Sequence, residues 1–207
     1  MHNRLIRLAF LLAVLIPATQ ALAEGVSALK PGDVLRGRFV QERFLQGFAN
    51  PLKSEGTFVL VPGQGLIWRV GKPFAVTTVM TRNGLAQQSD GATTLNLPAS
   101  RAPFMAGLYD MLSGALAGDW QALERDFTVV KAESDDDWSL QLTPTKKAPS
   151  DAMPITEIKI SGKAYVERVE IMKQGGDHDT LTFLDQQPTA NPLGADEVQL
   201  LQSVGQP

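Results

Sequence analysis

The sequence predicts a mainly β protein, built as one domain with a single helical insertion. Runs of β-branched and aromatic residues recur with turn signals about 8–12 residues apart, which is typical of an all-β sheet or barrel. Apolar residues adopt helical spacing only between Pro103 and Phe127. No internal repeat or low-complexity linker divides the 207 residues, and this length suits one domain with a sizeable core.

The first 23 residues have the pattern of a secretory signal peptide. Two arginines precede the apolar stretch of residues 8–16, and an A-x-A motif follows at residues 21–23. A basic start, an apolar core of about 7–15 residues and a small-residue site predict export and cleavage. The stretch is shorter than the about 20 apolar residues of a spanning helix. We therefore expect a signal peptide at residues 1–23 and a single domain at residues 24–207.

Six strands are expected before the helical insertion. They are predicted at Val34–Phe48, Gly56–Val61, Leu66–Val70, Phe74–Thr81, Gly84–Ser89 and Ala92–Leu97. Each run is bounded by Gly, Pro, Asn or Asp, and most of the runs are rich in β-branched or aromatic residues. The dipeptides Asn83-Gly84 and Asp90-Gly91 are strong hairpin signals, so the strands on either side of each dipeptide should pair as neighbours.

The pattern becomes helical after Pro103 and returns to strands near residue 127. Apolar residues stand near i, i+3, i+4 and i+7 positions at Met105, Leu108, Met111, Leu112, Leu116 and Leu123. Gly114 and Gly118 divide this stripe into two short pieces. Further strands are expected at Phe127–Ala132, Trp138–Pro144, Ile155–Ser161, Ala164–Lys173 and Thr180–Gln187. The tail from Pro188 to Pro207 is expected to hold a weak last strand and a loose end.

The glycine-rich loop Pro62–Gly65 has the composition of a phosphate site but not its context. Phosphate-binding loops lead into a helix whose N-terminal amides face the anion. Here the loop leads into the predicted strand Leu66–Val70. We therefore predict a hairpin turn.

The inventory of catalytic and metal-binding residues is small. The sequence has no cysteine, so it has no thiol nucleophile, thiolate metal site or disulfide. His178 stands in a Gly-Gly-Asp-His-Asp segment that we interpret as a solvated hairpin tip rather than a metal site. Ser134–Trp138 lacks the distal Gly and Glu of a calcium loop, and no Gly-x-Ser-x-Gly elbow is present. We expect no enzymatic activity, catalytic residue, metal or cofactor, and the net charge of −3 gives no support to nucleic-acid binding.

The chain as far as residue 120 is rich in large apolar residues. They include Phe39, Phe58, Trp68, Phe74, Phe104, Met105, Tyr109, Met111 and Trp120. A curved sheet with one helical cover could enclose a cavity lined by such side chains. Periodicity is equally compatible with a filled core, so both interpretations remain open at this point.

An ordered series of residues resembles a known family over roughly residues 34–187. The series comprises Phe39-Val40-Gln41, Ser54-x-Gly56-x-Phe58, the Pro62 turn ending in Leu66-Ile67-Trp68, Pro73, Asp90-Gly91 and Pro103-Phe104. It resembles the LolA family of periplasmic lipoprotein carriers. The resemblance implies an incomplete antiparallel β-barrel (a half-barrel) whose concave apolar face is covered by a helical lid.

The resemblance also implies a function, a cellular location and partners. The family shields acyl chains of lipoproteins between an inner-membrane transporter and an outer-membrane acceptor, so we expect a periplasmic, monomeric carrier. The cargo-binding residues are expected to be Phe39, Phe58, Leu60, Leu66, Trp68, Phe74, Phe104, Met105, Leu108, Met111 and Leu112. The alternative is a non-enzymatic interaction or envelope-sensor module on the same fold.

One position departs from the family pattern. Family members usually carry an arginine before the proline of the turn, where it pins the lid, whereas Val61 precedes Pro62 here. Arg69 is close by, but it follows Trp68 and should therefore point to the opposite face of the sheet. The chain is more similar to divergent LolA-like proteins found beside aryl-polyene or glycolipid biosynthesis functions. The expected cargo is thus a lipoprotein, a lipid or a polyene ester.

Overall fold

The computed structural model describes residues 29, 32–101, 113–114, 116, 123–134, 137–145, 155–190 and 192–205. The predicted signal peptide lies outside the described residues. Five of the predicted cargo-binding residues also lie outside them, namely Phe104, Met105, Leu108, Met111 and Leu112.

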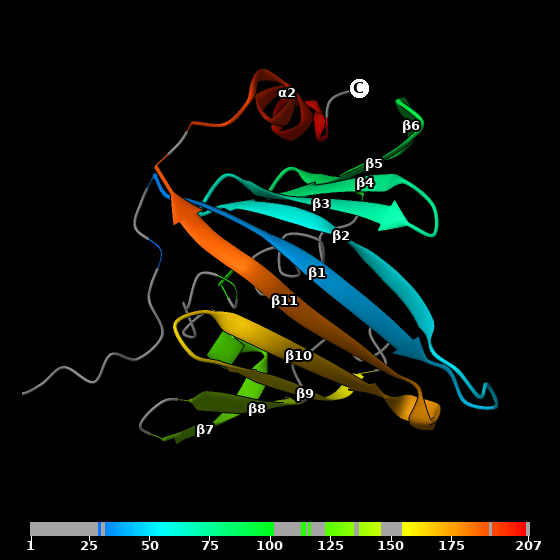
Figure 1. The fold of residues 1–207 in the computed structure, drawn as a ribbon, viewed down its shortest axis with the longest axis vertical. Coiled ribbons are helices and arrows are strands. Elements are labelled where there is room, and N and C mark those ends of the chain that lie inside the picture. The colour runs from blue at the N-terminus through cyan, green and yellow to red at the C-terminus, as the bar shows by residue number, and fades with distance from the viewer. Residues whose placement is uncertain are drawn as a thin grey trace, which may run out of the picture.

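The described strands form one antiparallel sheet of 11 strands (Figure 1). The strands are β1 Val34–Phe44, β2 Leu52–Val61, β3 Gly65–Lys72, β4 Val76–Thr81, β5 Gly84–Ser89, β6 Ala92–Pro98, β7 Phe127–Glu133, β8 Trp138–Pro144, β9 Ile155–Gly162, β10 Val166–Lys173 and β11 His178–Thr189. The remaining elements are the short 3-10 helices η1 Leu123–Arg125 and η2 Gln174–Gly176 and the helix α2 Ala195–Ser203. The prediction of a mainly β fold is confirmed.

Local turn chemistry sets the order of the neighbouring strands. Thr81 pairs with Gly84 across a turn formed by Arg82 and Asn83, one residue earlier than the Asn83-Gly84 dipeptide, and Ser89 pairs with Ala92 across Asp90-Gly91. The loop after β2 is also a hairpin turn, because Val61 pairs with Gly65 and the amide of Gln64 donates to the carbonyl of Val61 at 2.9 Å. The predictions for these three turns are confirmed.

The first and last strands pair in the middle of the sheet. The order is β6-β5-β4-β3-β2-β1-β11-β10-β9-β8-β7, so β6 and β7 are the two edges of the described sheet. Phe39 of β1 lies opposite Phe183 of β11 in the register. The sheet is therefore two meanders, one from each half of the chain, joined along the β1–β11 pair.

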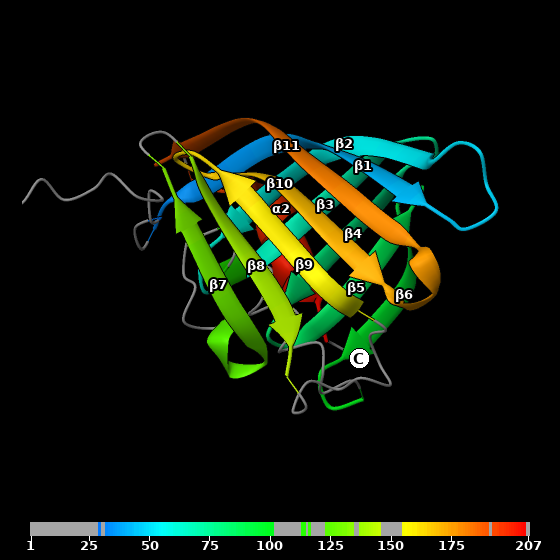
Figure 2. The ribbon, with the colours of Figure 1, turned by 90° about the horizontal axis from the view of Figure 1, so that it is seen from below.

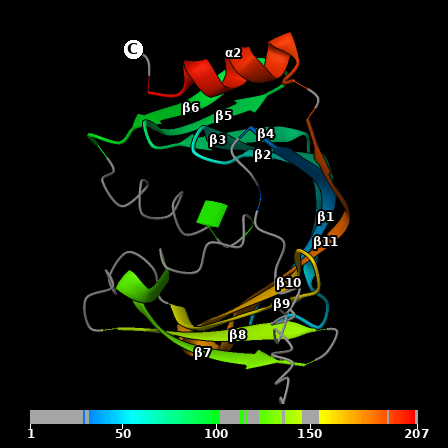
Figure 3. The same cartoon turned by 90° about the vertical axis from the view of Figure 1, so that its left-hand side faces the viewer.

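The sheet curves so that its two arms face each other. The first arm consists of β2–β6 and the second arm of β7–β10, and β1 and β11 connect them (Figure 3). Viewed from below, β7–β9 lie in front of β3–β5 (Figure 2). We call the concave side the inner face and the convex side the outer face.

Strand alternation divides the apolar residues between these two faces. On β2, Phe58 and Leu60 belong to the inner core, whereas Val59 and Val61 belong to a second, outer cluster. The inner core draws on both arms and is the larger of the two clusters. Because apolar residues lie on both faces of β2, the outer face of the sheet must also be covered.

The helix α2 provides that outer cover. It packs beyond the first arm (Figures 1 and 3), where Leu200, Leu201 and Val204 contact the outer cluster. The expectation of a loose end after Pro188 is therefore wrong. Acidic residues stand in the first turn of α2, and the backbone N–H of Gly194 donates to Glu197 Oε2 at 2.9 Å, which caps the helix N-terminus.

The part of the chain described here includes no helix with the length and hydropathy that a membrane span requires.

Candidate functional site

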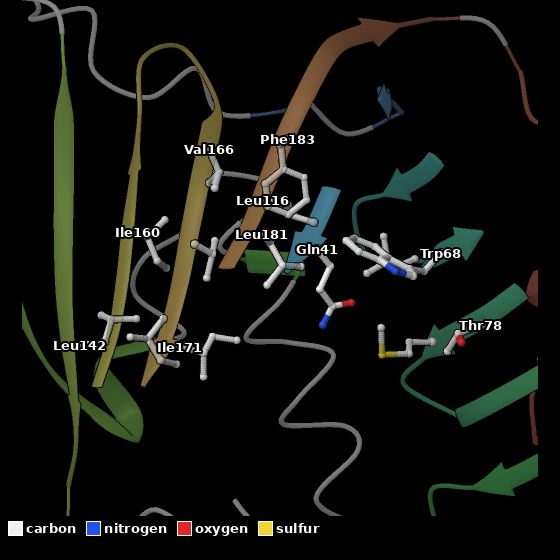
Figure 4. Close-up of a pocket in the computed structure, with 14 residues that line it drawn as sticks. Gln41, Trp68, Thr78, Leu116, Leu142, Ile160, Val166, Ile171, Leu181 and Phe183 are labelled. Carbon is white, nitrogen blue, oxygen red and sulfur yellow. The ribbon is translucent and has the colours of Figure 1, made fainter. Parts of the chain in front are cut away.

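An apolar cavity of about 250 Å³ lies on the inner face of the sheet (Figure 4). Its lining comprises Gln41, Leu66, Trp68, Thr78, Met80, Leu116, Leu142, Ile158, Ile160, Val166, Val169, Ile171, Leu181 and Phe183. All of these residues except Leu116 come from the two arms and from β1 and β11, so the curvature of the sheet creates most of the cavity. Two of them, Gln41 and Thr78, have polar side chains.

The cavity has the composition of a site for an apolar ligand. Small-molecule sites are lined mainly by apolar side chains and contain a few polar groups that orient the ligand. Thr78 already has a partner, because its hydroxyl accepts a hydrogen bond from Gln87 Nε2 at 3.1 Å. The cavity is somewhat smaller than the about 300–1,000 Å³ of typical small-molecule pockets. The arrangement can shield an apolar chain from water.

Two of the predicted cargo-binding residues, Leu66 and Trp68, line the cavity from β3. Three others, Phe39, Phe58 and Leu60, are buried in the inner core beside it. The hairpin at Pro62–Gly65 produces this arrangement, because it brings the inward positions of β2 and β3 side by side.

Aromatic rings of the inner core pack against the Trp68 indole. The ring of Phe39 stacks on that of Trp68 with centroids 3.7 Å apart, and the ring of Phe58 lies 6.2 Å away. Phe58 in turn contacts Phe183 edge-to-face at 5.4 Å. Gly37 makes this packing possible, because a Cβ at that position would lie 2.6 Å from the Phe58 ring.

Phe74 lies apart from this group. Its side chain is 79% exposed in the turn between β3 and β4, and it is not among the residues that line the cavity. The predicted strand from Phe74 to Thr81 begins only at Val76, because Pro73 and Phe74 form a bend after β3.

Most of the cavity lining comes from residues that follow Leu112, the last of the predicted cargo-binding residues. Leu142, Ile158, Ile160, Val169 and Ile171 line the second arm. Leu181 and Phe183 of β11 also line the cavity. A signal for these residues is present in the sequence, because they occupy alternate positions in strands whose other positions are mostly polar.

The helical insertion contributes to the lining through Leu116. Ser113, Gly114 and Leu116 are helical, as the spacing predicts, and Leu116 is buried in the inner core. Leu116 also lines the cavity. Part of the insertion therefore lies at the inner face.

The opposite side of β3 carries an ion-pair cluster. Arg69 points outward, as predicted, where its guanidinium lies 3.1 Å from Asp196 and 3.7 Å from Glu197 of α2. Arg36 of β1 donates two hydrogen bonds to Glu197, at 2.5 and 2.8 Å. The hydrogen bonds from Arg36 lower the pKa of Glu197 to about 2, and the same contact raises the pKa of Arg36. This cluster fastens α2 to the sheet.

No group of three or more His, Cys, Asp or Glu side chains gathers as a metal site within the described ranges. His178 is not at the tip of a turn. It is the first residue of β11 and stacks on Phe44, with ring centroids 4.3 Å apart. The prediction of a solvated hairpin tip at His178 is therefore wrong, because the 3-10 turn ends before this residue.

The sequence matches one family model over residues 23–191. The model describes the outer membrane lipoprotein carrier protein LolA-like family. A comparison with curated protein sequences gives no match.

The solved structures that match this chain share little sequence with it. A LolA superfamily protein from Nitrosomonas europaea is 11% identical with a TM-score of 0.43, over 84% of this chain and 92% of that one. A putative outer membrane lipoprotein-sorting protein domain from Vibrio parahaemolyticus is 12% identical with a TM-score of 0.36, over 83% and 92% of the two chains. The MucA/MucB complex of Pseudomonas aeruginosa contains a chain that is 14% identical with a TM-score of 0.35, over 82% and 56%.

Proposed function

This chain belongs to the family of LolA-like outer membrane lipoprotein carrier proteins, and on that premise we propose that it is a periplasmic carrier that shields the acyl or other apolar part of its cargo. The cargo class is a lipoprotein, a lipid or a polyene ester. The protein acts without catalysis and transfers its cargo from the inner toward the outer membrane.

The apolar cavity on the inner face is the observation that supports this proposal best. Twelve of its 14 lining residues have apolar side chains. Burial of each CH₂ group contributes about 0.8 kcal/mol, so even part of an acyl chain gains several kcal/mol on entering such a space. An acyl chain that crosses an aqueous compartment requires a shield of this kind.

The helical insertion is proposed to act as the cover of the cavity. The contact of Leu116 with the cavity supports this role. The five predicted residues from Phe104 to Leu112 extend the same apolar stripe in the sequence. In the proposed carrier they contact the cargo from the side opposite the sheet.

Export and partners complete the proposal. We propose that residues 1–23 are removed as a signal peptide and that residues 24–207 form one carrier domain. An inner-membrane transporter is the proposed donor, and an outer-membrane receptor is the proposed acceptor. N-terminal sequencing of the protein isolated from its native envelope should give Glu24 as the first residue.

Native mass spectrometry tests the carrier role directly. The protein should be purified from its native periplasm without detergent, and its mass should be compared with that of the denatured chain. We expect an additional mass from a bound acylated or polyene compound. The delipidated protein should bind the neutral fluorescent probe N-phenyl-1-naphthylamine, and long-chain amphiphiles should displace it.

Consistently empty protein that also fails to bind the probe would contradict the carrier role and would favour the interaction module instead. The matched control is a variant with the cavity filled, Ile160→Phe, which should fold but bind the probe more weakly. If this variant bound the probe as tightly as the native protein, the cargo site would have to lie outside the cavity.

A further inference from the structure

One end of the inner face is charged. Gln41 lines the cavity from β1, and Arg43 stands two positions further along the same face of that strand. The register places Arg43 opposite Asp179 on β11, just as it places Gln41 opposite Leu181. The cross-strand pair that lines the cavity is therefore followed by a charged pair.

A second cation joins this pair from β10. Lys173 stands two positions beyond Ile171, which lines the cavity. Its Nζ donates to Asp179 Oδ2 at 2.5 Å, while Arg43 Nε donates to Asp179 Oδ1 at 3.0 Å. We call Arg43, Lys173 and Asp179 the charged cluster.

The charged cluster has a net charge of +1. The Asp179 residue is only 5% exposed and serves as counter-ion to both cations. One cation would suffice to neutralise this carboxylate, so the second leaves a positive charge at the end of an apolar surface. Such a charge is stabilised by an anion more than by the neutral side chains beside it.

The cations retain donors for a further partner. The side chain of Arg43 is 49% exposed and that of Lys173 is 25% exposed. Among the described residues, Asp179 alone forms a hydrogen bond or ion pair with either side chain. An arginine has five N–H donors and a lysine has three, so several remain available.

The amide of Gln41 provides a third donor. Figure 4 shows this side chain extending from β1 into the space that the lining residues surround. It forms no hydrogen bond with another described residue. A polar group that faces an apolar cavity is stabilised only when a ligand or water provides its partner.

We propose that the cavity binds amphiphiles with an anionic head, whose head group lies at Gln41 and the charged cluster while the chain occupies the apolar space. This inference rests on the proposed carrier role and specifies its cargo. A carboxylate or a phosphate monoester has the shared chemistry that these donors recognise. An apolar chain and an anionic head must be joined in one molecule for both regions to be used.

Competition between two amphiphiles of equal chain length tests the proposal. Decanoate and decanol should each displace N-phenyl-1-naphthylamine from the full-length mature protein at pH 7, with decyl phosphate as a third competitor. We expect decanoate and decyl phosphate to bind at least tenfold more tightly than decanol, which corresponds to about 1.4 kcal/mol. Acetate and inorganic phosphate, which have no chain, should not displace the probe.

Variants assign the preference to the charged cluster. Arg43→Gln and Lys173→Gln should each reduce the preference for decanoate over decanol by at least fivefold. Both should leave the affinity for the neutral probe unchanged, which shows that the protein is folded. The matched control is Arg38→Gln, because Arg38 lies on the same strand and pairs with Asp185 of β11 on the outer face. This variant should retain the full preference.

The outcomes separate this inference from the carrier role. Equal binding of decanoate and decanol by the native protein would overturn the proposed preference for an anionic head group but leave the carrier role intact. A preference that survives in both cluster variants would also overturn it. Displacement by acetate or phosphate alone would show a site for free anions instead of amphiphiles. Failure of every amphiphile and of the neutral probe to bind would refute both proposals.

Discussion

Trp68 stacks on Phe39 although the two residues lie on strands that are not neighbours. Their ring centroids are 3.7 Å apart, and β2 runs between β3 and β1 in the sheet. Trp68 is half-buried and lines the cavity, whereas Phe39 is 1% exposed behind it. The two rings therefore form a stack with one member in the core and the other at the cavity surface.

This difference predicts different consequences for the two alanine variants. Phe39→Ala should lower the free energy of unfolding by about 3–5 kcal/mol, the usual effect for a large aromatic residue in a filled core. Trp68→Ala should lower it by less and should weaken binding of the neutral probe by about fivefold, or about 1 kcal/mol. Urea unfolding and probe titration measure the two effects. A large stability loss in Trp68→Ala with unchanged binding would remove Trp68 from the site.

The ion pair between Arg36 and Glu197 predicts a pH dependence of stability. The pKa of Glu197 falls from an ordinary value of 4.5 to about 2 in the folded protein, because Arg36 donates hydrogen bonds to it. A carboxyl with a depressed folded pKa contributes stability that is fully present above its unfolded pKa. This contribution should therefore be lost as the pH falls from about 4.5 to about 2.

Glu197→Gln isolates that contribution. The variant should be less stable than the native protein by about 1–3 kcal/mol at pH 7, and the difference should vanish near pH 2. The matched control is Asp185→Asn, which removes an exposed pair with Arg38 and should change stability by no more than about 1 kcal/mol. Urea unfolding at several pH values provides the measurement. A difference that does not depend on pH would contradict the role of Glu197.

The absence of a side chain at Gly65 is predicted to allow α2 to pack closely on the sheet. A Cβ at this position would lie 2.4 Å from Leu201 Cδ2 and 3.0 Å from the carbonyl oxygen of Met80. Gly65→Ala should therefore lower the free energy of unfolding by about 1–3 kcal/mol through overpacking.

A double-mutant cycle tests the proposed contact at Gly65. Leu201→Ala removes the side chain that the new Cβ would meet, so the double variant should be more stable than the sum of the single effects predicts. We expect a coupling of about 0.5–1 kcal/mol, measured by urea unfolding. Strict additivity would place the strain at the Met80 carbonyl or the Thr81 methyl group instead, since each would lie 3.0 Å from the new Cβ.

Substitution of Phe74 is predicted to affect neither stability nor probe binding. Because its ring is 79% exposed and is not among the residues that line the cavity, Phe74→Ser should change the free energy of unfolding by no more than about 0.5 kcal/mol. Binding of the neutral probe should also be unchanged. Weakened binding would extend the cargo site to the turn between β3 and β4.

The strands and hairpins could be predicted because their signals are local. Asp90-Gly91 favours a tight turn because both residues adopt positive φ, of 51° and 77°, whatever the rest of the chain does. The two-residue period of a strand likewise assigns Val59 and Ile67 to one face of the sheet and Phe58 and Trp68 to the other. The outward direction of Arg69 follows from the same rule.

The pairing of β1 with β11 and the docking of α2 could not be predicted in this way. The contact between Arg36 and Glu197 joins positions 161 residues apart, and nothing in either segment specifies the other. The helix α2 has only nine residues, too few for a stable isolated helix, so its stability comes from packing on the sheet. The predicted cargo-binding residues end at Leu112, whereas Ile158 and Ile160 reach the cavity only because the sheet curves and brings the second arm to face the first.

The pairing of the first strand with the last has a consequence for how the chain matures. The inner face cannot be completed until β11, which begins at His178, has been synthesised, because β1 and β11 join the two meanders. Contacts of such long sequence separation form slowly, since the loop between them must first be closed. A growing chain therefore stays incompletely folded until nearly all of it has been made.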